Sequence, residues 1–217
     1  IYMGDWSSDV CSSDLLLAQD YAARRQAFGA PLAQQPLHRE TLAMLDAESA
    51  AAFLLTFELI ELLGRAETGE LDDRGHALLR LATPLAKAVT GKQAVAVLSE
   101  VVEAFGGAGY VEDTGIPTLL RDAQVLPIWE GTTNVLALDL LLRADLQAGT
   151  EALRERFKSI SQIIDSEDMK SAFAVAETRL RDTLTTFAAA SAPGEREAGA
   201  RRFVLGLGLY GDRKSVV

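Results

Sequence analysis

Cysteine and histidine are scarce in this chain, and their scarcity excludes several kinds of site. Among the 217 residues there is one cysteine, Cys11, so neither a disulfide framework nor a cluster of thiolate metal ligands is possible. The two histidines, His38 and His76, have no partner at the spacing of a zinc site, and we expect both on helix surfaces. No metal site is therefore predicted, and the low cysteine content favours a reducing, cytoplasmic setting.

Positive charge and long apolar runs are lacking as well. The formal net charge is −10, which argues against non-specific binding of the whole chain to nucleic acid or to anionic lipid. No apolar run in the sequence reaches the roughly 20 residues that are needed to span a bilayer. The sequence therefore predicts no membrane partner.

Helix-forming residues make up most of what the sequence does contain. Hydrophobic residues account for 48% of the chain, Ala and Leu dominate, and β-branched runs are scarce. Apolar positions recur at helical spacing, with an irregularity expected near Pro84. The helices predicted on this basis span residues 16–28, 37–63, 77–105, 117–125, 133–143, 153–164, 169–189 and 195–209. Long helices with short connections predict an all-α, up-down antiparallel bundle, and the three C-terminal segments predict a further helical extension.

Both ends of the chain differ in character from the rest. Residues 6–15 read WSSDVCSSDL, a near-repeat of five residues without helical or strand period, and the chain closes with GDRKSVV. Both strings resemble translated sequencing-adapter contamination, and the alternative at the N-terminus is a polar tail that leads into a helix. We therefore expect non-native tails at residues 1–15 and 211–217, the bundle at 16–146 and the extension at 147–210.

One carboxylate stands apart in the stretch AFGGAGYVEDTGIPTLLRDAQVLPIWEGTTNVL, residues 104–136. Glu130 lies between a tryptophan and a Gly-Thr-Thr-Asn run that opens an apolar helix. A carboxylate beside an aromatic ring and small residues is a candidate base, because an apolar pocket raises the carboxyl pKa toward working pH. The alternative is a glutamate that only favours a helix N-terminus through the helix dipole.

Three further motifs contain residue types that suit a nucleotide. Arg25 and Phe28 belong to the sequence RQAFG, and an arginine fork binds phosphate oxygens in bidentate fashion. The run Glu103–Tyr110 is rich in glycines, which let backbone N–H groups approach a ligand closely. Thr132 and Asn134 offer a hydroxyl and an amide. Each motif also has a local alternative: an arginine at a helix C-terminus, glycines that end a helix, and threonines that act as N-caps.

The order and spacing of these motifs resemble the C-terminal helical domain of the acyl-CoA dehydrogenase family, FAD enzymes that desaturate acyl-CoA thioesters. The resemblance implies that Glu130 removes the α proton of an acyl-CoA while FAD accepts the β hydride. It implies an electron-transfer flavoprotein as electron acceptor and a homo-oligomer, tetramer or dimer, in which the arginine of RQAFG reaches the FAD of an adjacent subunit. The implied cofactor-binding residues are Arg25, Phe28, Gln35, Glu103, Phe105, Gly106, Gly107, Thr132 and Asn134.

The resemblance covers residues 16–145, the last of the family's three domains, so the chain alone is expected to be inactive and free of FAD. Gln35-Pro36-Leu37, Glu103 (where the family commonly has Gln) and Trp129 resemble the adaptive alkylation-response branch, flavoproteins linked to DNA protection that carry an additional C-terminal helical region. Acidic residues offset the basic ones after Asp145, which argues against a DNA-binding face.

Three interpretations stay open: an acyl-CoA dehydrogenase, which we prefer; an alkylation-response flavoprotein with weak dehydrogenase activity and DNA contact; and a non-catalytic helical oligomerisation module. Arg121 and Asp122, which resemble the family's Arg-Asp-Ala segment, are expected to form a local ion pair.

Overall fold

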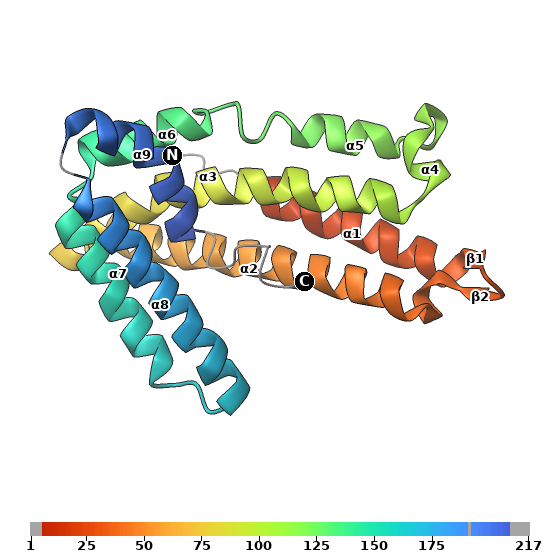
Figure 1. Ribbon diagram of the computed structural model, residues 1–217, viewed down its shortest axis with the longest axis horizontal. Helices are drawn as coiled ribbons and strands as arrows, with labels where there is room; N and C mark the ends of the chain where they lie inside the picture. The colour runs from red at the N-terminus through yellow and green to blue at the C-terminus, as the bar shows by residue number, and fades with distance from the viewer. Residues whose placement is uncertain (1–5, 191, 209–217) are drawn as a thin grey trace. The chain divides into compact units, whose positions relative to one another are not determined.

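A computed structural model describes residues 6–190 and 192–208, and helices make up nearly all of this part of the chain (Figure 1). The only strands among the described residues are the two-residue strands β1 (Gln26–Ala27) and β2 (Ala30–Pro31). The all-α prediction is therefore confirmed. The described chain divides into two compact units. Unit 1 contains the described residues up to Glu58 together with Thr90–Glu130. Unit 2 contains Leu59–Val89 together with the described residues from Gly131 onward.

Unit 1 is a bundle of helices that alternate in direction along the chain (Figure 1). Its core is a cluster of Leu, Val and Ala side chains at three- and four-residue spacing, which places them on one face of each helix. Truncating one of the fully buried leucines, such as Leu98, is expected to cost about 2–5 kcal/mol. The elements of this unit are α1 (Trp6–Arg24), η1 (Leu32–Gln34), the first part of α2 (Pro36–Glu67), the last part of α3 (Asp73–Ala104), α4 (Gly107–Tyr110), η2 (Glu112–Thr114) and α5 (Ile116–Ala123).

The first helix ends earlier than predicted. We expected a helix over residues 16–28 capped by Gly29, but α1 stops at Arg24 and a two-residue hairpin follows. Both loop residues of the hairpin have positive φ, +52° at Phe28 and +84° at Gly29, the combination that a type I′ turn requires. A chain that turns back over two residues cannot continue the helix, so the glycine serves the hairpin turn.

Asp14 is an exception on the core-facing side of α1. It is 4% exposed on the same face as Ala18 and Ala22, and burial raises the pKa of its carboxyl to about 6. Its Oδ2 atom has no hydrogen-bond partner within the described part of the chain. A buried, incompletely paired carboxylate destabilises a core, so this position suits an apolar residue better.

Unit 2 has a core of its own, in which three helices of the C-terminal region take part. Leu140 of α6, Leu180 of α8 and Leu207 of α9 are all buried in one cluster with residues of α3. Asp145 and Ser166 are the N-caps of α7 and α8, and their side chains accept from Ala148 N and Met169 N. The bounds are α6 (Thr133–Arg143), α7 (Leu146–Ser161), α8 (Glu167–Ala189) and α9 (Pro193–Gly208).

Two predictions about these helices need correction. The segment predicted to begin at Leu153 begins at Leu146, because Asp145 caps the helix seven residues earlier. The irregular helix start expected near Pro84 is not found, since α3 runs from Asp73 to Ala104 without interruption and buries the proline. The predicted helix end at Leu209 lies outside the described residues.

Within the described residues, no helix combines the length and the apolar character that a membrane crossing requires.

Candidate functional site

Glu130 stands in a turn whose backbone is strained. The amides of Ile128 and Trp129 both donate to the carbonyl of Val125, which tightens the chain after α5. Glu130 then has φ +58°, a left-handed value that is uncommon for a residue with a Cβ, and Gly131 follows at +112°. Strain of this kind costs about 1–3 kcal/mol and is concentrated at functional sites.

The Glu130 side chain points into solvent and has apolar neighbours in the sequence that are also exposed. Ile128 is 60% and Trp129 is 55% exposed, although both are large hydrophobic residues. The apolar surroundings that would make Glu130 a strong base are therefore not supplied by the described residues around it. A ligand or another polypeptide that covers this surface would supply them.

The backbone before this turn is seated on α3 through a glycine. A Cβ built at Gly91 would lie 3.3 Å from the Leu126 carbonyl carbon and from Pro127 N. The peptide that precedes the turn therefore rests directly against the helix backbone at a position where a side chain would intrude. This contact fixes the height of the turn along α3.

The helix that follows Glu130 in sequence begins with a capped threonine. Thr132 is the N-cap of α6, and its hydroxyl accepts from Val135 N at 3.5 Å, as the capping alternative predicted. Asn134 is exposed, and its Oδ1 accepts a hydrogen bond from Arg201 Nη1 at 2.9 Å. Sequence reasoning did not assign Arg201 to the site, because 67 residues separate the two partners.

The RQAFG motif lies at the hairpin end of unit 1. Arg25 is exposed just after α1, and Phe28 is 99% exposed at the tip of the β1–β2 loop. Gln35 is half-buried, and its Nε2 donates to the Ala27 carbonyl at 3.2 Å, so it ties the hairpin to the start of α2. The arginine and the phenylalanine are open to a second molecule, whereas the Gln35 amide already holds the hairpin.

The glycine-rich run ends α3, as the structural alternative predicted, and its glycines differ in their surroundings. Gly106 requires its residue type because its φ is +60°, and Gly109 because a Cβ there would collide with the Val102 carbonyl oxygen. Neither backbone conformation nor packing requires a glycine at position 107, since its φ is not positive and a Cβ there would meet nothing within 4 Å. Its open backbone is available to a ligand from outside the chain.

Two other predicted residues flank this run. Glu103 is exposed in the last turn of α3. Phe105 is half-buried and packs on Tyr21, with ring centroids 4.6 Å apart, so its ring contributes to the bundle core. Phe105 therefore has a structural role of its own.

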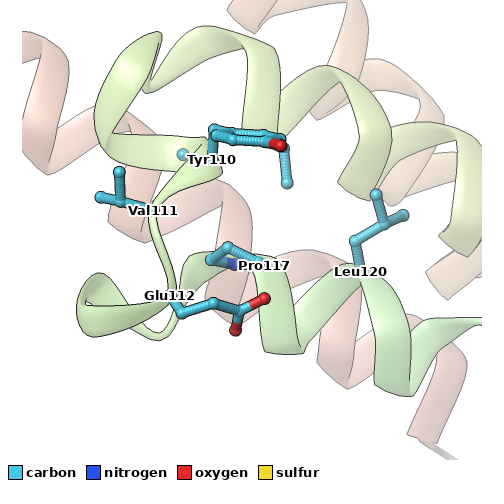
Figure 2. Close-up of a pocket in the computed structure, with 7 residues that line it drawn as sticks. Tyr110, Val111, Glu112, Pro117 and Leu120 are labelled. Carbon is cyan, nitrogen blue, oxygen red and sulfur yellow. The ribbon is translucent and has the colours of Figure 1, made fainter.

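A hollow of ≈ 420 Å³ lies beside the glycine-rich run (Figure 2). Figure 2 shows the Tyr110 ring on one side of it, with Pro117 and the Glu112 carboxylate on the other. Glu112 pairs with Arg121 at 3.3 Å, which corrects the predicted Arg121–Asp122 pair: the arginine reaches across from α5 to η2. None of the predicted cofactor-binding residues lines this hollow.

The predicted residues of unit 1 thus form two groups at different heights along α3. Arg25, Phe28, Gln35, Glu103 and the glycines belong to the hairpin end, whereas the turn that leads to Glu130 is seated at Gly91. Twelve residues separate Gly91 from Glu103 in α3, which corresponds to about 18 Å of helix. One copy of the chain therefore does not bring the two groups into contact.

Comparison with known proteins identifies the family. Residues 10–145 match the profile described as "Acyl-CoA dehydrogenase, C-terminal domain". Because this match covers more than half of the chain, the protein belongs to the acyl-CoA dehydrogenase family.

Three relatives illustrate the extent of the similarity. "Acyl-CoA dehydrogenase family member 11" of Caenorhabditis elegans is 54% identical over 125 residues, which are 58% of this chain and 20% of that protein. AidB of Escherichia coli (strain K12) is 37% identical over 145 residues, 66% of this chain and 26% of that protein. The crystal structure of C. elegans ACDH-11 in complex with C11-CoA superposes with a TM-score of 0.85 at 38% identity, covering 94% of this chain and 36% of that one. The chain therefore spans 20% to 36% of the length of these relatives.

Proposed function

We propose that this chain is the C-terminal part of an FAD-dependent acyl-CoA dehydrogenase in which Glu130 is the base. The observation that carries the proposal is the strained, exposed conformation of Glu130 within the sequence IWEGTT, in a chain of this family. A backbone strained at a charged, exposed side chain does not help folding, so the conformation calls for a functional explanation. The likeness to a protein crystallised with C11-CoA supports an acyl-CoA as the ligand.

The proposed chemistry at Glu130 is a proton transfer. The carboxylate takes the proton from the α carbon of a saturated acyl-CoA, and the electron pair of that C–H bond forms the new double bond as the hydride leaves the β carbon. FAD, when bound, would supply the acceptor for that hydride, and the product would be a trans-2-enoyl-CoA. Covering the exposed Ile128 and Trp129 with ligand would dehydrate the carboxylate and raise its basicity.

Several residues of the chain fit an FAD ligand. Arg25 is an exposed guanidinium suited to a diphosphate, Phe28 offers a free aromatic face, and Gly107 leaves room for close backbone approach. Glu103 is the poorest fit, because its negative charge would repel a diphosphate. An electron-transfer flavoprotein is the electron acceptor we propose, after the family.

The separation of the two groups in unit 1 supports a homo-oligomer, a tetramer or a dimer. In this arrangement the hairpin end of one subunit would bind the FAD that lies beside Glu130 of another subunit. A second feature agrees: α2 exposes large apolar side chains along its length, with Phe53 and Phe57 in ring contact at 4.3 Å. The exposed residues on this face of α2 in unit 1 are Phe53, Leu54 and Phe57. A face of this kind is expected to be buried against another polypeptide.

Subunit complementation tests this arrangement. Full-length Arg25→Ala and Glu130→Gln variants, each of low activity, would be co-expressed in equal amounts. Random assembly of dimers gives about a quarter of the sites an intact arginine and an intact glutamate from different subunits. Recovered activity near that fraction supports the shared site, and activity no higher than the sum of the two variants contradicts it.

The proposed reaction is tested with the full-length protein that contains this chain. Acyl-CoAs of different chain length and branching are added without oxygen, and the flavin absorbance is followed. Bleaching with at least one thioester is expected, and Glu130→Gln should abolish it while Glu177→Gln, a matched change at an exposed position of α8, leaves it intact. Bleaching that survives Glu130→Gln would remove Glu130 from the role of base.

The alkylation-response flavoprotein with DNA contact is the second candidate, and the helical region after Asp145 favours it. Against DNA contact, Arg154 and Lys170 in this region already pair with Glu151 and Glu167. Bound FAD without bleaching by any thioester, together with salt-sensitive DNA binding, would support it. A non-catalytic oligomerisation module would instead retain every function of the full-length protein after Glu130→Gln.

A further inference from the structure

A cation from the C-terminal region holds one of the proposed cofactor-binding side chains. Arg201 of α9 donates from Nη1 to Oδ1 of Asn134, the second helical residue of α6, at 2.9 Å. Both partners belong to unit 2, and both side chains are exposed. The bond therefore lies at a surface that another molecule can reach.

The helices that carry these two residues are firmly anchored. Ala137 and Leu140 of α6 share a buried cluster with Ala200 and Val204 of α9, which flank Arg201 in sequence. Phe203 stacks on Phe187 of α8 with centroids 4.0 Å apart. Arg201 is thus presented to Asn134 from a helix fixed by its own core, and the geometry of the bond is set before any ligand arrives.

The chemistry of the two groups fixes which way the amide faces. A guanidinium has five N–H donors and no acceptor, so the atom of Asn134 that faces Arg201 is the carbonyl oxygen. The NH₂ group of the same amide is then turned away from α9. A free asparagine can turn either its oxygen or its NH₂ group toward a ligand, but this one presents its NH₂ group on the side that faces away from α9.

We propose that Arg201 is a positioning residue that holds Asn134 as a hydrogen-bond donor to an oxygen atom of bound FAD. This inference rests on the proposed function, in which Asn134 contacts the cofactor. It makes the C-terminal region a part of the cofactor site, although its sequence lies outside the matched residues 10–145. FAD, rich in phosphate, hydroxyl and carbonyl oxygens, offers the acceptors that an oriented NH₂ group requires.

Equilibrium binding of FAD to the full-length apoprotein, followed by quenching of flavin fluorescence, tests the proposal. Arg201→Ala is expected to weaken FAD binding about three- to tenfold, the effect of one lost hydrogen-bond orientation at a partly solvated site. Arg201→Lys, which keeps a donor and the charge, should recover part of that loss. Arg202→Ala is the matched control, an exposed neighbour on the same helix, and should bind FAD like the wild type.

Asn134→Asp separates the positioning role from a structural one. The aspartate keeps an acceptor for Arg201, and the bond becomes charge-assisted, so thermal unfolding of the apoprotein should be unchanged or improved. The substitution removes the NH₂ donor, so FAD binding should fall at least as far as in Arg201→Ala. A bond that serves only the fold predicts the same thermal stability for Asn134→Asp but with FAD affinity retained.

A double-mutant cycle completes the test. Asn134→Ala and Arg201→Ala should be non-additive in FAD affinity, because the arginine acts only through the asparagine. The proposal would be overturned if the losses of FAD affinity in the two single variants added up in the double variant. It would also be overturned if Arg201→Ala left FAD affinity unchanged or changed only the KM for acyl-CoA. The proposed function fails by a different result, when the wild-type protein binds no FAD or when Glu130→Gln leaves flavin reduction intact.

Discussion

Two turns of this chain share an unusual backbone, and they differ in what holds them. Phe28-Gly29 and Glu130-Gly131 each combine a non-glycine residue at positive φ with a glycine at positive φ, and they hold the only non-glycine residues of that kind among the described positions. At the hairpin, the pairing of Ala27 with Ala30 closes the turn, so the strain follows from local geometry. No such ladder among the described residues closes the Glu130 turn, and the backbone that precedes it at Leu126–Pro127 lies against Gly91 of α3.

The strained backbone has a local cause at the hairpin turn but not at the Glu130 turn. Each left-handed residue costs roughly 1–2 kcal/mol, and in both turns the strained residue has an exposed side chain. Neither exposed side chain makes contacts within the described chain that would offset this cost in folding free energy. The hairpin geometry accounts for the positive φ of Phe28. Under the proposed function its exposed ring contacts FAD and the Glu130 carboxylate does chemistry, so substitutions at the two turns should have opposite signatures.

The largest effect is expected at Glu130. Glu130→Gln preserves the shape of the side chain but removes the proposed base, so the rate of flavin reduction by acyl-CoA should fall by about 10²- to 10⁴-fold. FAD affinity should stay at the wild-type value. Stopped-flow absorbance measures the rate of flavin reduction, and equilibrium binding measures FAD affinity, both on the full-length protein. A loss of FAD binding in Glu130→Gln would show that the Glu130 turn, like the hairpin, acts through cofactor binding.

Phe28→Ala should produce the reverse signature. Removing a phenylalanine that is buried only in the complex forfeits about 1.5–3 kcal/mol of apolar contact, which corresponds to about a ten- to hundredfold weaker FAD complex. Flavin reduction at saturating FAD should be nearly unchanged. Ile163→Ala, at another highly exposed apolar position, is the control for general surface effects.

The glycines distinguish the turns by stability. Gly29→Ala meets no neighbour within 4 Å and should cost about 1–2 kcal/mol from its positive φ alone. Gly131→Ala adds a contact of 3.3 Å with Leu136 Cδ2 at a φ of +112°, so it should cost more. Urea denaturation of the two variants gives the free energies of unfolding, and equal losses would show that packing at Gly131 is unimportant.

The smallest effects are expected from relief of strain. Asparagine adopts left-handed φ values more readily than Phe or Glu, so Phe28→Asn and Glu130→Asn should each stabilise the fold by up to about 1 kcal/mol. Both variants should lose the function assigned to the residue they replace. Thermal unfolding measured beside FAD binding and flavin reduction checks this, and a destabilised Glu130→Asn would mean that the glutamate has a structural role.

Much of the fold could be predicted from periodicity and capping. The helix predicted over residues 133–143 has those bounds, because a threonine cap and a run of leucines mark it clearly. The hairpin at Gln26–Pro31 could not be predicted in the same way, since strands of two residues leave no alternating pattern. The start of α7 was missed because the Asp145 cap precedes a first turn, Leu-Gln-Ala-Gly, that contains a glycine and no apolar repeat.

The candidate site was predictable where it is local and unpredictable where it is not. The turn at Glu130 has a signature in the sequence, but its exposure depends on what covers it. The Arg201–Asn134 bond joins residues 67 positions apart, and helical periodicity contains no information about which exposed arginine meets which asparagine. Asp14 illustrates a third case: a buried carboxylate without a full set of partners breaks the apolar pattern of its helix face, so periodicity could not predict its burial.

Gly91 has a consequence for how this protein can change over time. Because the peptide at Leu126–Pro127 lies against the helix backbone at Gly91, main-chain contact positions the start of the turn that leads to Glu130, the proposed base. Under the proposed function, side chains around the turn can then be exchanged without displacing the Glu130 carboxylate, so the walls of the proposed acyl site are free to vary. Position 91 is constrained, because a side chain there would crowd the backbone of Leu126 and Pro127. A library that randomises the residues around the turn should therefore keep Gly91.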